Sequence, residues 1–274
     1  AKQAITLEVE DQIVHIPSTH LTRQFRDYDN SLSLIYEGRC YAYWTRCEAS
    51  QRQFLKINGE PTVGLDFRSS QLRCIYLWET GEKLDPDYDA YDLEVQGHKI
   101  DRVIVKKMNM YLLNVDSATK QTQYLNYWHQ ECDKNHKKKP ADKWSGKEQA
   151  RIYKETLRLK GITSAKLREA YLEKHAVIRR HFLNGVKGGQ FAAWLESNVV
   201  FSIANRAIAE GIPCLTVHDE FIVPLKHKDK MLELMYSDPT YTDKDEFDYR
   251  GYYGWRMHRA DKTPSFPISF KSEF

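Results

Sequence analysis

The feature that most constrains the fold is a run of apolar residues interrupted by a polar triplet. Residues 214–224 read Cys-Leu-Thr-Val-His-Asp-Glu-Phe-Ile-Val-Pro, so His218, Asp219 and Glu220 separate two short apolar stretches. Two such stretches on either side of a few polar residues are typical of a β-hairpin. The sequence therefore predicts a hairpin with these polar side chains at its tip.

A second short strand is predicted to end in a carboxylate. A turn at residues 58–59 precedes an apolar strand that ends at Asp66. A helix should follow directly, because Ser69 or Ser70 can cap its start and Gly81 can end it. Its apolar face is formed by Leu72, Ile75, Tyr76 and Trp78.

Most of the chain between these two strands has a helical pattern. Apolar residues recur at helical spacing over residues 101–115, and residues 149–183 form one or two helices interrupted at Gly161. A long helix should follow the Gly188-Gly189 pair and break at residues 211–213. Two strands are expected within residues 1–37, and one more helix after Lys226.

Composition excludes several classes of protein. With 41% hydrophobic and 29% charged residues, the 274-residue chain has ordinary globular composition. No apolar run approaches the ~20 residues that span a bilayer, and no export signal is evident, so we expect a cytoplasmic protein without a membrane partner. The five cysteines are scattered without a C-x-x-C pair, which favours reduced thiols.

A lysine-rich run is the strongest local charge feature. The net charge of +3 is too balanced to indicate nucleic-acid binding by itself, but residues 134–147 are densely basic and include Lys137, Lys138 and Lys139. Such a run either contacts phosphates in a salt-sensitive way or forms a solvated loop. Both interpretations stay open.

Two carboxylates at strand ends indicate a metal site. Mg²⁺ prefers oxygen ligands and takes one or two protein carboxylates together with phosphate and water. Two ions ~3.5–4 Å apart can stabilise the attacking and leaving oxygens of a phosphoryl transfer. A single Asp after a strand is more often a cap or turn residue, so the surrounding motifs decide the interpretation.

Four motifs in order resemble those of family A DNA polymerases. Residues 65–73, Leu-Asp-Phe-Arg-Ser-Ser-Gln-Leu-Arg, resemble the first palm motif D-Y-S-Q-I-E-L-R, and residues 216–220, Thr-Val-His-Asp-Glu, match the V-H-D-E motif. Residues 102–110 fit the fingers-helix pattern R-x-x-x-K-x-x-N-F, and Gly38-Arg39 resembles the G-R pair upstream of the palm strand. The short intervals look like those of compact phage and mobile-element relatives.

The resemblance implies an α+β fold with a polymerase palm. An antiparallel sheet would carry both aspartates, with a helical fingers lobe inserted between them. Residues 1–37 would supply N-terminal strands or a thumb remnant, 38–80 the first palm part, 81–183 the fingers and basic insertion, and 184–274 the second palm part and tail. No segment of the sequence is long enough for an exonuclease domain, and we expect the thumb to be reduced or absent. Processivity should therefore be low unless an upstream domain or an accessory protein holds the duplex.

The resemblance also implies template-dependent nucleotidyl transfer with two Mg²⁺ or Mn²⁺ ions. Asp66 and Asp219 would be the metal ligands, assisted by the backbone carbonyl of Phe67. Arg102 and Lys106, one helical turn apart, would meet the triphosphate of the incoming nucleoside triphosphate.

Other matching residues would contact the primed DNA template. His218 would hold the primer end or orient the hairpin, Glu220 would tune the metal site, and Arg39 would contact the primer and template. Gln190 and Asn198 on the long helix would follow the duplex, although buried hydrogen-bonding roles are equally compatible with their positions.

The sequence departs from the family where the sugar is selected. Gln71 and Asn114 occupy the places of the Glu and Tyr that exclude ribose, and Met110 replaces the aromatic residue of the fingers helix, as in single-subunit RNA polymerases. We therefore expect sugar discrimination that is weak or built from different residues. The match at His218 to Glu220 and that at Arg39 favour DNA polymerase over RNA polymerase.

Two other interpretations stay open on sequence alone. One is a catalytically inactive nucleic-acid-binding module on a polymerase scaffold, although binding a polyanion does not require two carboxylates facing it. The other is a metal-dependent nuclease, which lacks the additional acidic ligands expected near the pair and leaves the fingers pattern unexplained.

Overall fold

The computed structural model describes residues 4–9, 12–16, 21–27, 36–85, 87–138 and 157–237. Within them the main sheet has six strands in the order β2-β1-β5-β6-β10-β9, each antiparallel to its neighbours. These strands are β1 (Ile5–Val9), β2 (Gln12–Ile16), β5 (Leu55–Ile57), β6 (Glu60–Asp66), β9 (Leu215–Val217) and β10 (Glu220–Pro224). The strands predicted to carry the two aspartates, β6 and β10, are therefore neighbours inside one sheet.

Helices make up most of the chain between β6 and β9. They are α2 (Ser70–Thr80), α3 (Arg102–Asn114), α4 (Ala118–Lys138), α6 (Ser164–Lys174), η2 (Ala176–His181) and α7 (Val186–Ala209), with a small ribbon of β7 (Glu94–Val95) and β8 (His98–Lys99). The other elements are β3 (Thr22–Phe25), β4 (Glu37–Tyr41), η1 (Trp44–Arg46), α1 (Ala49–Arg52), η3 (Leu225–His227) and α8 (Lys228–Tyr236). The expected α+β fold with an antiparallel sheet is confirmed.

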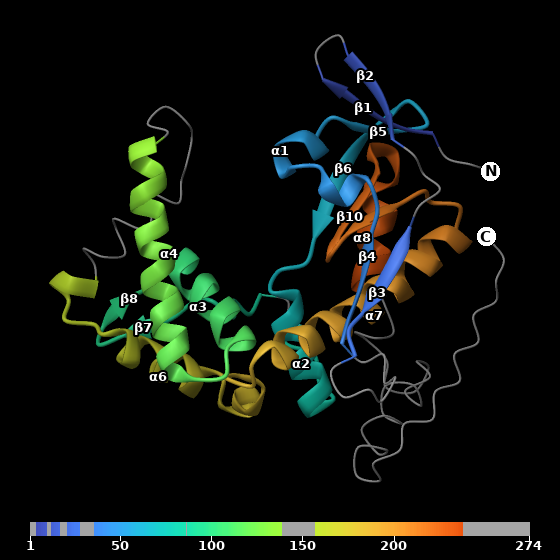
Figure 1. Cartoon of the computed structure of the whole chain (residues 1–274). Coiled ribbons are helices and arrows are strands. Elements are labelled where there is room, and N and C mark those ends of the chain that lie inside the picture. The colour runs from blue at the N-terminus through green and yellow to red at the C-terminus, as the bar shows by residue number, and fades with distance from the viewer. Residues whose placement is uncertain are drawn as a thin grey trace.

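The elements form two lobes. Figure 1 shows α3, α4, α6 and the β7–β8 ribbon on one side, and the main sheet with β3, β4 and α8 on the other. We call these the helical lobe and the sheet lobe. Helices α2 and α7 join them, because α7 packs against β4 and α8 as well as against α2 and α3.

Each face of the main sheet packs against a hydrophobic core, and successive residues of a strand alternate between the two. Leu65, Phe221 and Val223 face the large core that also contains α2, α7 and α8 and continues into the helical lobe. Ile222 faces a smaller core with Trp44 on the other side. Because successive residues of a strand point to opposite faces, this alternation fixes the pairing register of β6 and β10.

The glycine pair near the start of α7 corrects a sequence prediction. Gly188 and Gly189 lie inside the helix, not before it, and Gly185 takes the cap position. A Cβ atom on Gly188 would lie 2.8 Å from the backbone oxygen of Leu113, and one on Gly189 would collide with the Asn114 amide. The glycines therefore serve the close packing of α3 on α7 rather than the start of a helix.

Several local predictions are confirmed. The hairpin forms with His218 and Asp219 in its turn, and Asp66 ends β6. The helix expected at residues 101–115 spans Arg102–Asn114, and Gly81 ends α2 with a left-handed φ of 71°. Helix α8 is found where one helix was expected after the hairpin.

The predicted serine cap of α2 was wrong. Ser69 stands at the cap position with a left-handed φ of 59°, and its side chain makes no capping hydrogen bond. The hydroxyl of Ser70 instead contacts two carboxyl groups. Ser70 is thus held by these carboxyl groups, and the start of α2 has no side-chain cap.

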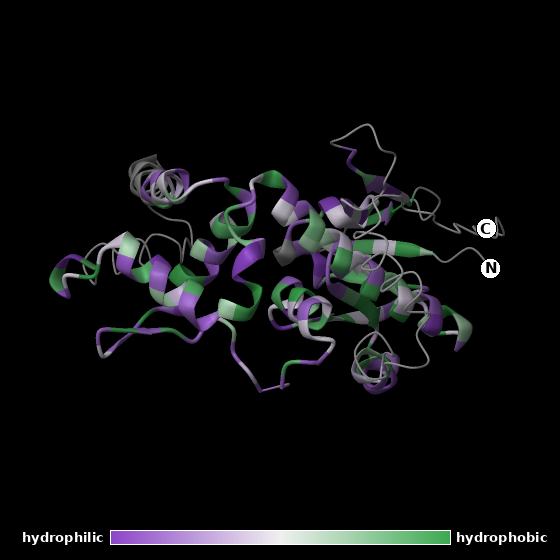
Figure 2. Cartoon of the chain, turned by 90° about the horizontal axis from the view of Figure 1, so that it is seen from below, coloured by the Kyte–Doolittle hydropathy of each residue, from purple (hydrophilic) through white to green (hydrophobic). Residues whose placement is uncertain are grey.

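The surface pattern of the helices follows from the packing. Figure 2 shows hydrophilic and hydrophobic residues alternating around the helices of both lobes, as expected where one face of a helix is buried. None of the helices in the described ranges is long and apolar enough to cross a membrane. The four cysteines whose side chains are described, Cys40, Cys47, Cys74 and Cys214, are free thiols.

Candidate active site

The register of the main sheet brings Asp66 and Asp219 together. Glu220, the first residue of β10, lies directly opposite Asp66, the last residue of β6. Asp219 precedes Glu220 in the hairpin turn, where His218 adopts a left-handed φ of 58°. The side chains of Asp66 and Asp219 are close enough for Asp219 to affect the titration of Asp66.

This proximity perturbs the titration of Asp66. Partial burial, followed by the charge of Asp219 and the hydrogen bond to it, raises the pKa of Asp66 to about 7, with a smaller contribution from Glu220. Lys106 acts in the opposite direction. Two carboxylates this close cannot both stay charged without a proton or a cation between them. The pair is therefore a place where a cation would be stabilised.

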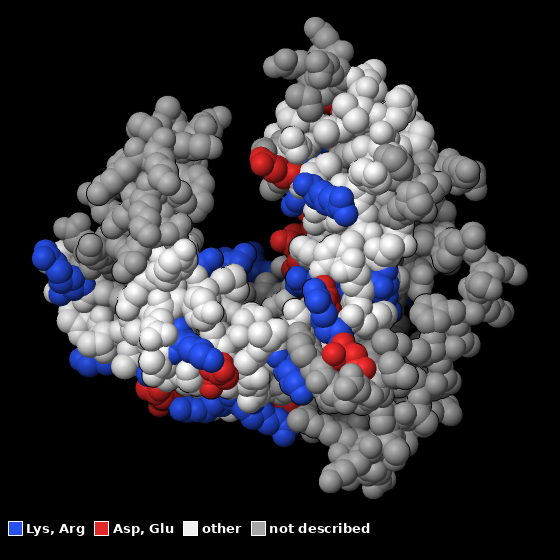
Figure 3. Space-filling view, viewed as in Figure 1, with Lys and Arg blue, Asp and Glu red and all other residues white. Residues whose placement is uncertain are grey.

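A cavity of about 440 Å³ opens at the aspartate pair. It is lined by Arg39, Asp66, Phe67, Arg68, Ser69, Ser70, Gln71, Tyr91, Arg102, Lys106, Glu196 and Asp219. Figure 3 shows the molecular surface hollowed between the two lobes, with blue Lys and Arg and red Asp and Glu side chains around the hollow. The cavity thus combines carboxylates from the sheet lobe with cations from both lobes.

The cations of the helical lobe come from α3. Arg102 and Lys106 are one turn apart and both line the cavity, as their spacing predicts. Arg102 donates a hydrogen bond from Nε to Asp89 Oδ2 at 3.1 Å and lies 5.0 Å from the ring centre of Tyr91. Lys106 is exposed and makes no ion pair with another described residue. One of the two cations is thus held by a loop, and the other is open to the cavity.

A buried network lies under the aspartates. Ser70 Oγ is 2.6 Å from Asp219 Oδ2 and 2.5 Å from Glu196 Oε1, and Glu196, only 2% exposed, also accepts a hydrogen bond from Arg39 Nε at 3.0 Å. A hydroxyl carries one hydrogen, so the second short contact requires a proton on a carboxyl group. Burial raises the pKa of Glu196, and the charge of Arg39 opposes this effect.

Sequence reasoning missed this network. Ser70 was considered only as a helix cap, and Glu196 was not considered, nor were Arg68 and Tyr91. Glu196 did leave a signal, because it is the one charged residue within the apolar stretch 191–200 of α7. A carboxylate in the middle of a buried helix face needs a partner, and here the partners are Ser70 and Arg39.

His218 and Glu220 lie beside the cavity rather than in its lining. The ring of His218 meets that of Tyr41 edge-on with centroids 6.4 Å apart, and burial, followed by the charge of Arg39, lowers the pKa of His218. Glu220 pairs with Arg52 at 3.0 Å. Its carboxylate lies over Gly64, where any Cβ atom would collide with it.

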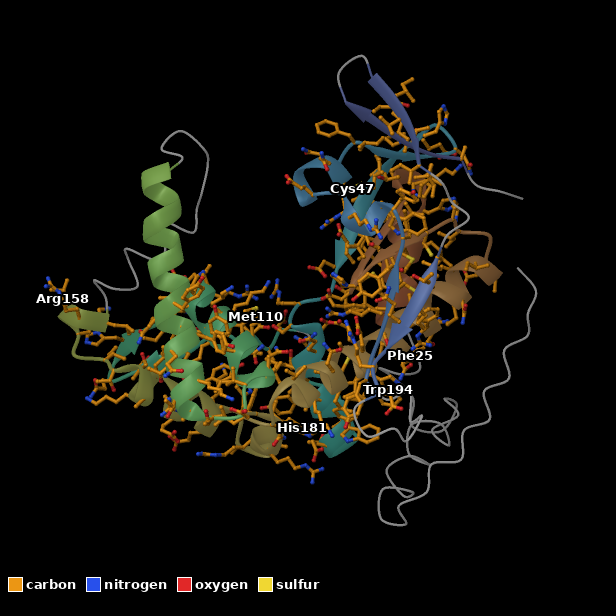
Figure 4. All side chains as sticks on the ribbon, viewed as in Figure 1. Phe25, Cys47, Met110, Arg158, His181 and Trp194 are labelled. Carbon is orange, nitrogen blue, oxygen red and sulfur yellow. The ribbon has the colours of Figure 1, made fainter. Side chains whose placement is uncertain are left out.

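The residues expected to select the nucleotide are divided between two places. Gln71 and Phe67 line the cavity. Met110 is 42% exposed on α3, and Figure 4 shows it on the part of the helical lobe that lies toward the sheet lobe. Asn114, further along α3, donates from Nδ2 to the backbone oxygen of Met110 at 2.7 Å and does not line the cavity.

The residues expected to contact a DNA duplex differ in their surroundings. Asn198 accepts a hydrogen bond from Arg23 Nη2 at 2.7 Å. Oε1 of Gln190 is buried and has no hydrogen-bond partner. The side chains of Lys137 and Lys138 at the end of α4, and all of Lys139, lie outside the described residues.

A metal ion at this site would have few protein ligands. In the described part of the chain, no three His, Cys, Asp or Glu side chains gather in a group that could hold a metal ion. An ion here would depend on the aspartate pair, with its other ligands from backbone, water or substrate. Comparisons of the chain with protein-family models, with curated proteins and with solved structures find no match.

Proposed function

We propose that this protein is a template-dependent nucleotidyltransferase that extends a DNA primer with nucleoside triphosphates. The observation that carries the proposal is the meeting of Asp66 and Asp219 at the end of β6 and the start of β10, opposite the cations of α3. A nucleotidyl-transfer centre needs carboxylates for the metal ions and cations for the triphosphate, and one cavity holds both.

The aspartate pair fits Mg²⁺ or Mn²⁺. Its donors are oxygens, and burial and the neighbouring charge of Asp219 raise the pKa of Asp66, so a cation beside the pair would be stabilised. Asp66 and Asp219 would hold two ions together with the backbone carbonyl of Phe67. When bound, such ions neutralise charge on the attacking and leaving oxygens.

The other cavity residues would bind and orient the substrates. Lys106 would contact the triphosphate directly, and Arg102 would do so after exchanging its hydrogen bond with Asp89 for one with phosphate. Arg39, held by Glu196, would present its guanidinium to the primer end. These groups position the reacting atoms, which is the main protein contribution to phosphoryl transfer.

The arrangement is compatible with a compact family A palm and fingers. In this reading the sheet lobe is the palm, α3 is the fingers helix that closes over the nucleotide, and residues 1–37 add strands to the palm sheet. Gln71 lies in the cavity and Asn114 lies outside it, so neither provides the Glu and Tyr barrier of the family. The proposal therefore includes tolerance of ribonucleotides.

A primer-extension assay tests the proposal. A labelled primer on a longer template is incubated with all four deoxynucleotides and Mg²⁺ or Mn²⁺, beside Asp219→Ala and a control, Asp229→Ala, whose aspartate lies exposed on α8. We expect extension by the wild type and by Asp229→Ala, and none by Asp219→Ala. Shortening of the primer would instead indicate a nuclease, and a mobility shift without extension would indicate a binding module.

A further inference from the structure

Exposed aromatic side chains lie where α3 meets α4. Tyr124 and Tyr127 of α4 are 49% and 56% exposed, and Met110 of α3 is 42% exposed. The ring of Tyr124 is stacked on that of Tyr111, with centroids 5.7 Å apart and planes inclined by 22°. We call Met110, Tyr111, Tyr124 and Tyr127 the tyrosine surface.

The tyrosine surface begins next to the candidate active site. Lys106 lines the cavity, and Met110 lies one turn further along the same face of α3, about 6 Å along the helix axis. Lys107 and Tyr111 form the next strip around the helix, and Tyr111 contacts Tyr124 of α4. The exposed face of α3 therefore leads without interruption from the cavity to the tyrosines.

A positive charge is built into this surface. The ammonium group of Lys107 lies 5.4 Å from the ring centre of Tyr111 and 5.6 Å from that of Trp128. The part of α4 that precedes and includes the tyrosines, residues 118–128, contains no acidic residue. The rings and this cation thus lie together where α3 meets α4.

This combination fits unpaired bases joined by phosphates. Every base has a π-face, so base stacking on tyrosine is tolerant of sequence, and nearby cations follow the backbone. An apolar protein partner would require a contiguous hydrophobic patch, whereas tyrosine combines an apolar ring with a polar hydroxyl group. A blunt duplex offers no open base faces to stack.

We propose that the tyrosine surface binds single-stranded nucleic acid and leads the unpaired template strand to the active-site cavity. The use of the strand as a template rests on the proposed function. The binding itself does not, because it requires neither metal ions nor the aspartates.

Binding of a fluorescently labelled, unstructured oligothymidylate to the full chain tests this inference. Fluorescence anisotropy in the presence of a chelator excludes chemistry. We expect the double variant Tyr124→Ala/Tyr127→Ala to bind at least about tenfold more weakly than the wild type. The control Tyr236→Ala removes a still more exposed tyrosine from α8 and should bind like the wild type.

Further measurements show whether the loss of binding affinity is due to the loss of ring stacking. Tyr124→Phe/Tyr127→Phe keeps the rings and should restore binding, and an abasic oligonucleotide of the same length should bind all variants alike. An RNA oligonucleotide should lose as much affinity as DNA, since stacking does not involve the sugar.

The inference is overturned if the alanine variant binds the oligothymidylate as well as the wild type, or if the phenylalanine variant binds as poorly as the alanine variant. Failure of the proposed function is distinguishable. A chain that does not extend primers but shows ring-dependent binding refutes only the polymerase. One that extends primers with ring-independent binding refutes only the tyrosine surface.

Discussion

The two sides of the active-site cavity are held in place in different ways. On the sheet side, Asp66 and Asp219 are fixed by the pairing of β6 with β10 and by the buried contacts of Ser70 and Glu196. On the helix side, Arg102 is tied to a loop residue and Lys106 projects into the cavity.

This difference suggests a division of work. The carboxylates are part of a backbone ladder and a buried network, so their geometry is set before any ligand arrives. The cations are the ends of long, flexible side chains on α3, so they can adjust to a triphosphate although the helix itself packs closely on α7. Variants that loosen the fixed side should cost activity, and variants that move the helix should cost stability first.

The first prediction tests whether the close contact of α3 with α7 sets the stability of the helix side of the cavity. In Gly188→Ala the new Cβ would press on backbone oxygens of Leu113 and His181, at 2.8 and 3.0 Å. Overpacking costs about 1–3 kcal/mol, against about 1 kcal/mol gained in helix propensity, so we expect a net loss of up to about 2 kcal/mol in the free energy of unfolding. Urea denaturation measures it.

Gly189→Ala is the matched control for that variant. Its Cβ would meet the flexible side-chain amide of Asn114 instead of backbone. We expect a smaller loss, because an amide can rotate away. Equal losses in the two variants would show that helix propensity and strain elsewhere, not the backbone contact, decide the outcome.

Variants of Ser70 test whether its hydroxyl group holds Asp219 in place on the sheet side of the cavity. Ser70→Ala removes the group that joins Asp219 to Glu196, and we expect the maximal rate of extension to fall by about tenfold with little change in nucleotide KM. Ser70→Thr keeps the hydroxyl and should retain most of the rate. A rise in KM alone would mean that the network serves nucleotide binding and not the position of Asp219.

The aspartate pair should weaken the fold where both groups are charged. The pKa of Asp66 is raised to about 7 in the folded chain from its ordinary value near 4, so its contribution favours folding below about pH 4 and is lost as the pH rises through 7. Without divalent ions, Asp66→Asn should therefore melt at a higher temperature than the wild type at pH 8.

The same comparison at pH 4.5 should show a much smaller difference, and Mg²⁺ should raise the melting temperature of the wild type and of the control variant but not that of Asp66→Asn. Asp229→Asn, exposed on α8, is the control. A constant difference between wild type and Asp66→Asn across this pH range would mean that the two aspartates do not interact as described.

The smallest expected effect concerns the sugar. Gln71 lines the cavity without a negative charge, so the wild type should prefer deoxynucleotides over ribonucleotides by far less than about a thousandfold. Gln71→Glu should raise this preference by a few fold, measured as the ratio of kcat/KM for the two nucleotides. A thousandfold preference in the wild type would show that another group excludes ribose.

The sequence predicted the local parts of this structure well. The hairpin at residues 215–224, the strand ending at Asp66 and helix α3 each depend on a short pattern of apolar and polar residues, which is enough to specify them. The end of α2 at Gly81 was predictable because glycine accepts the left-handed conformation there.

The parts that were not predictable depend on contacts across long stretches of sequence. Glu196 meets Ser70 from a position 126 residues away, and nothing local to Ser70 distinguishes this role from a helix cap. The Gly188-Gly189 pair suggests a helix boundary in the sequence, and only the packing of α3 against it explains why it lies inside α7. Helix α4 was not predicted, since only Gln121 and Leu125 are fully buried in its first eleven residues and its apolar pattern is weak.

The most direct test of the account is single-nucleotide incorporation under single-turnover conditions across a Mg²⁺ titration. We predict that Asp66→Asn and Asp219→Asn each lose at least about a thousandfold in rate at every Mg²⁺ concentration, while Asp229→Asn follows the wild type. Incorporation by either of the first two variants at the wild-type rate would contradict the assignment of the aspartate pair as the metal site.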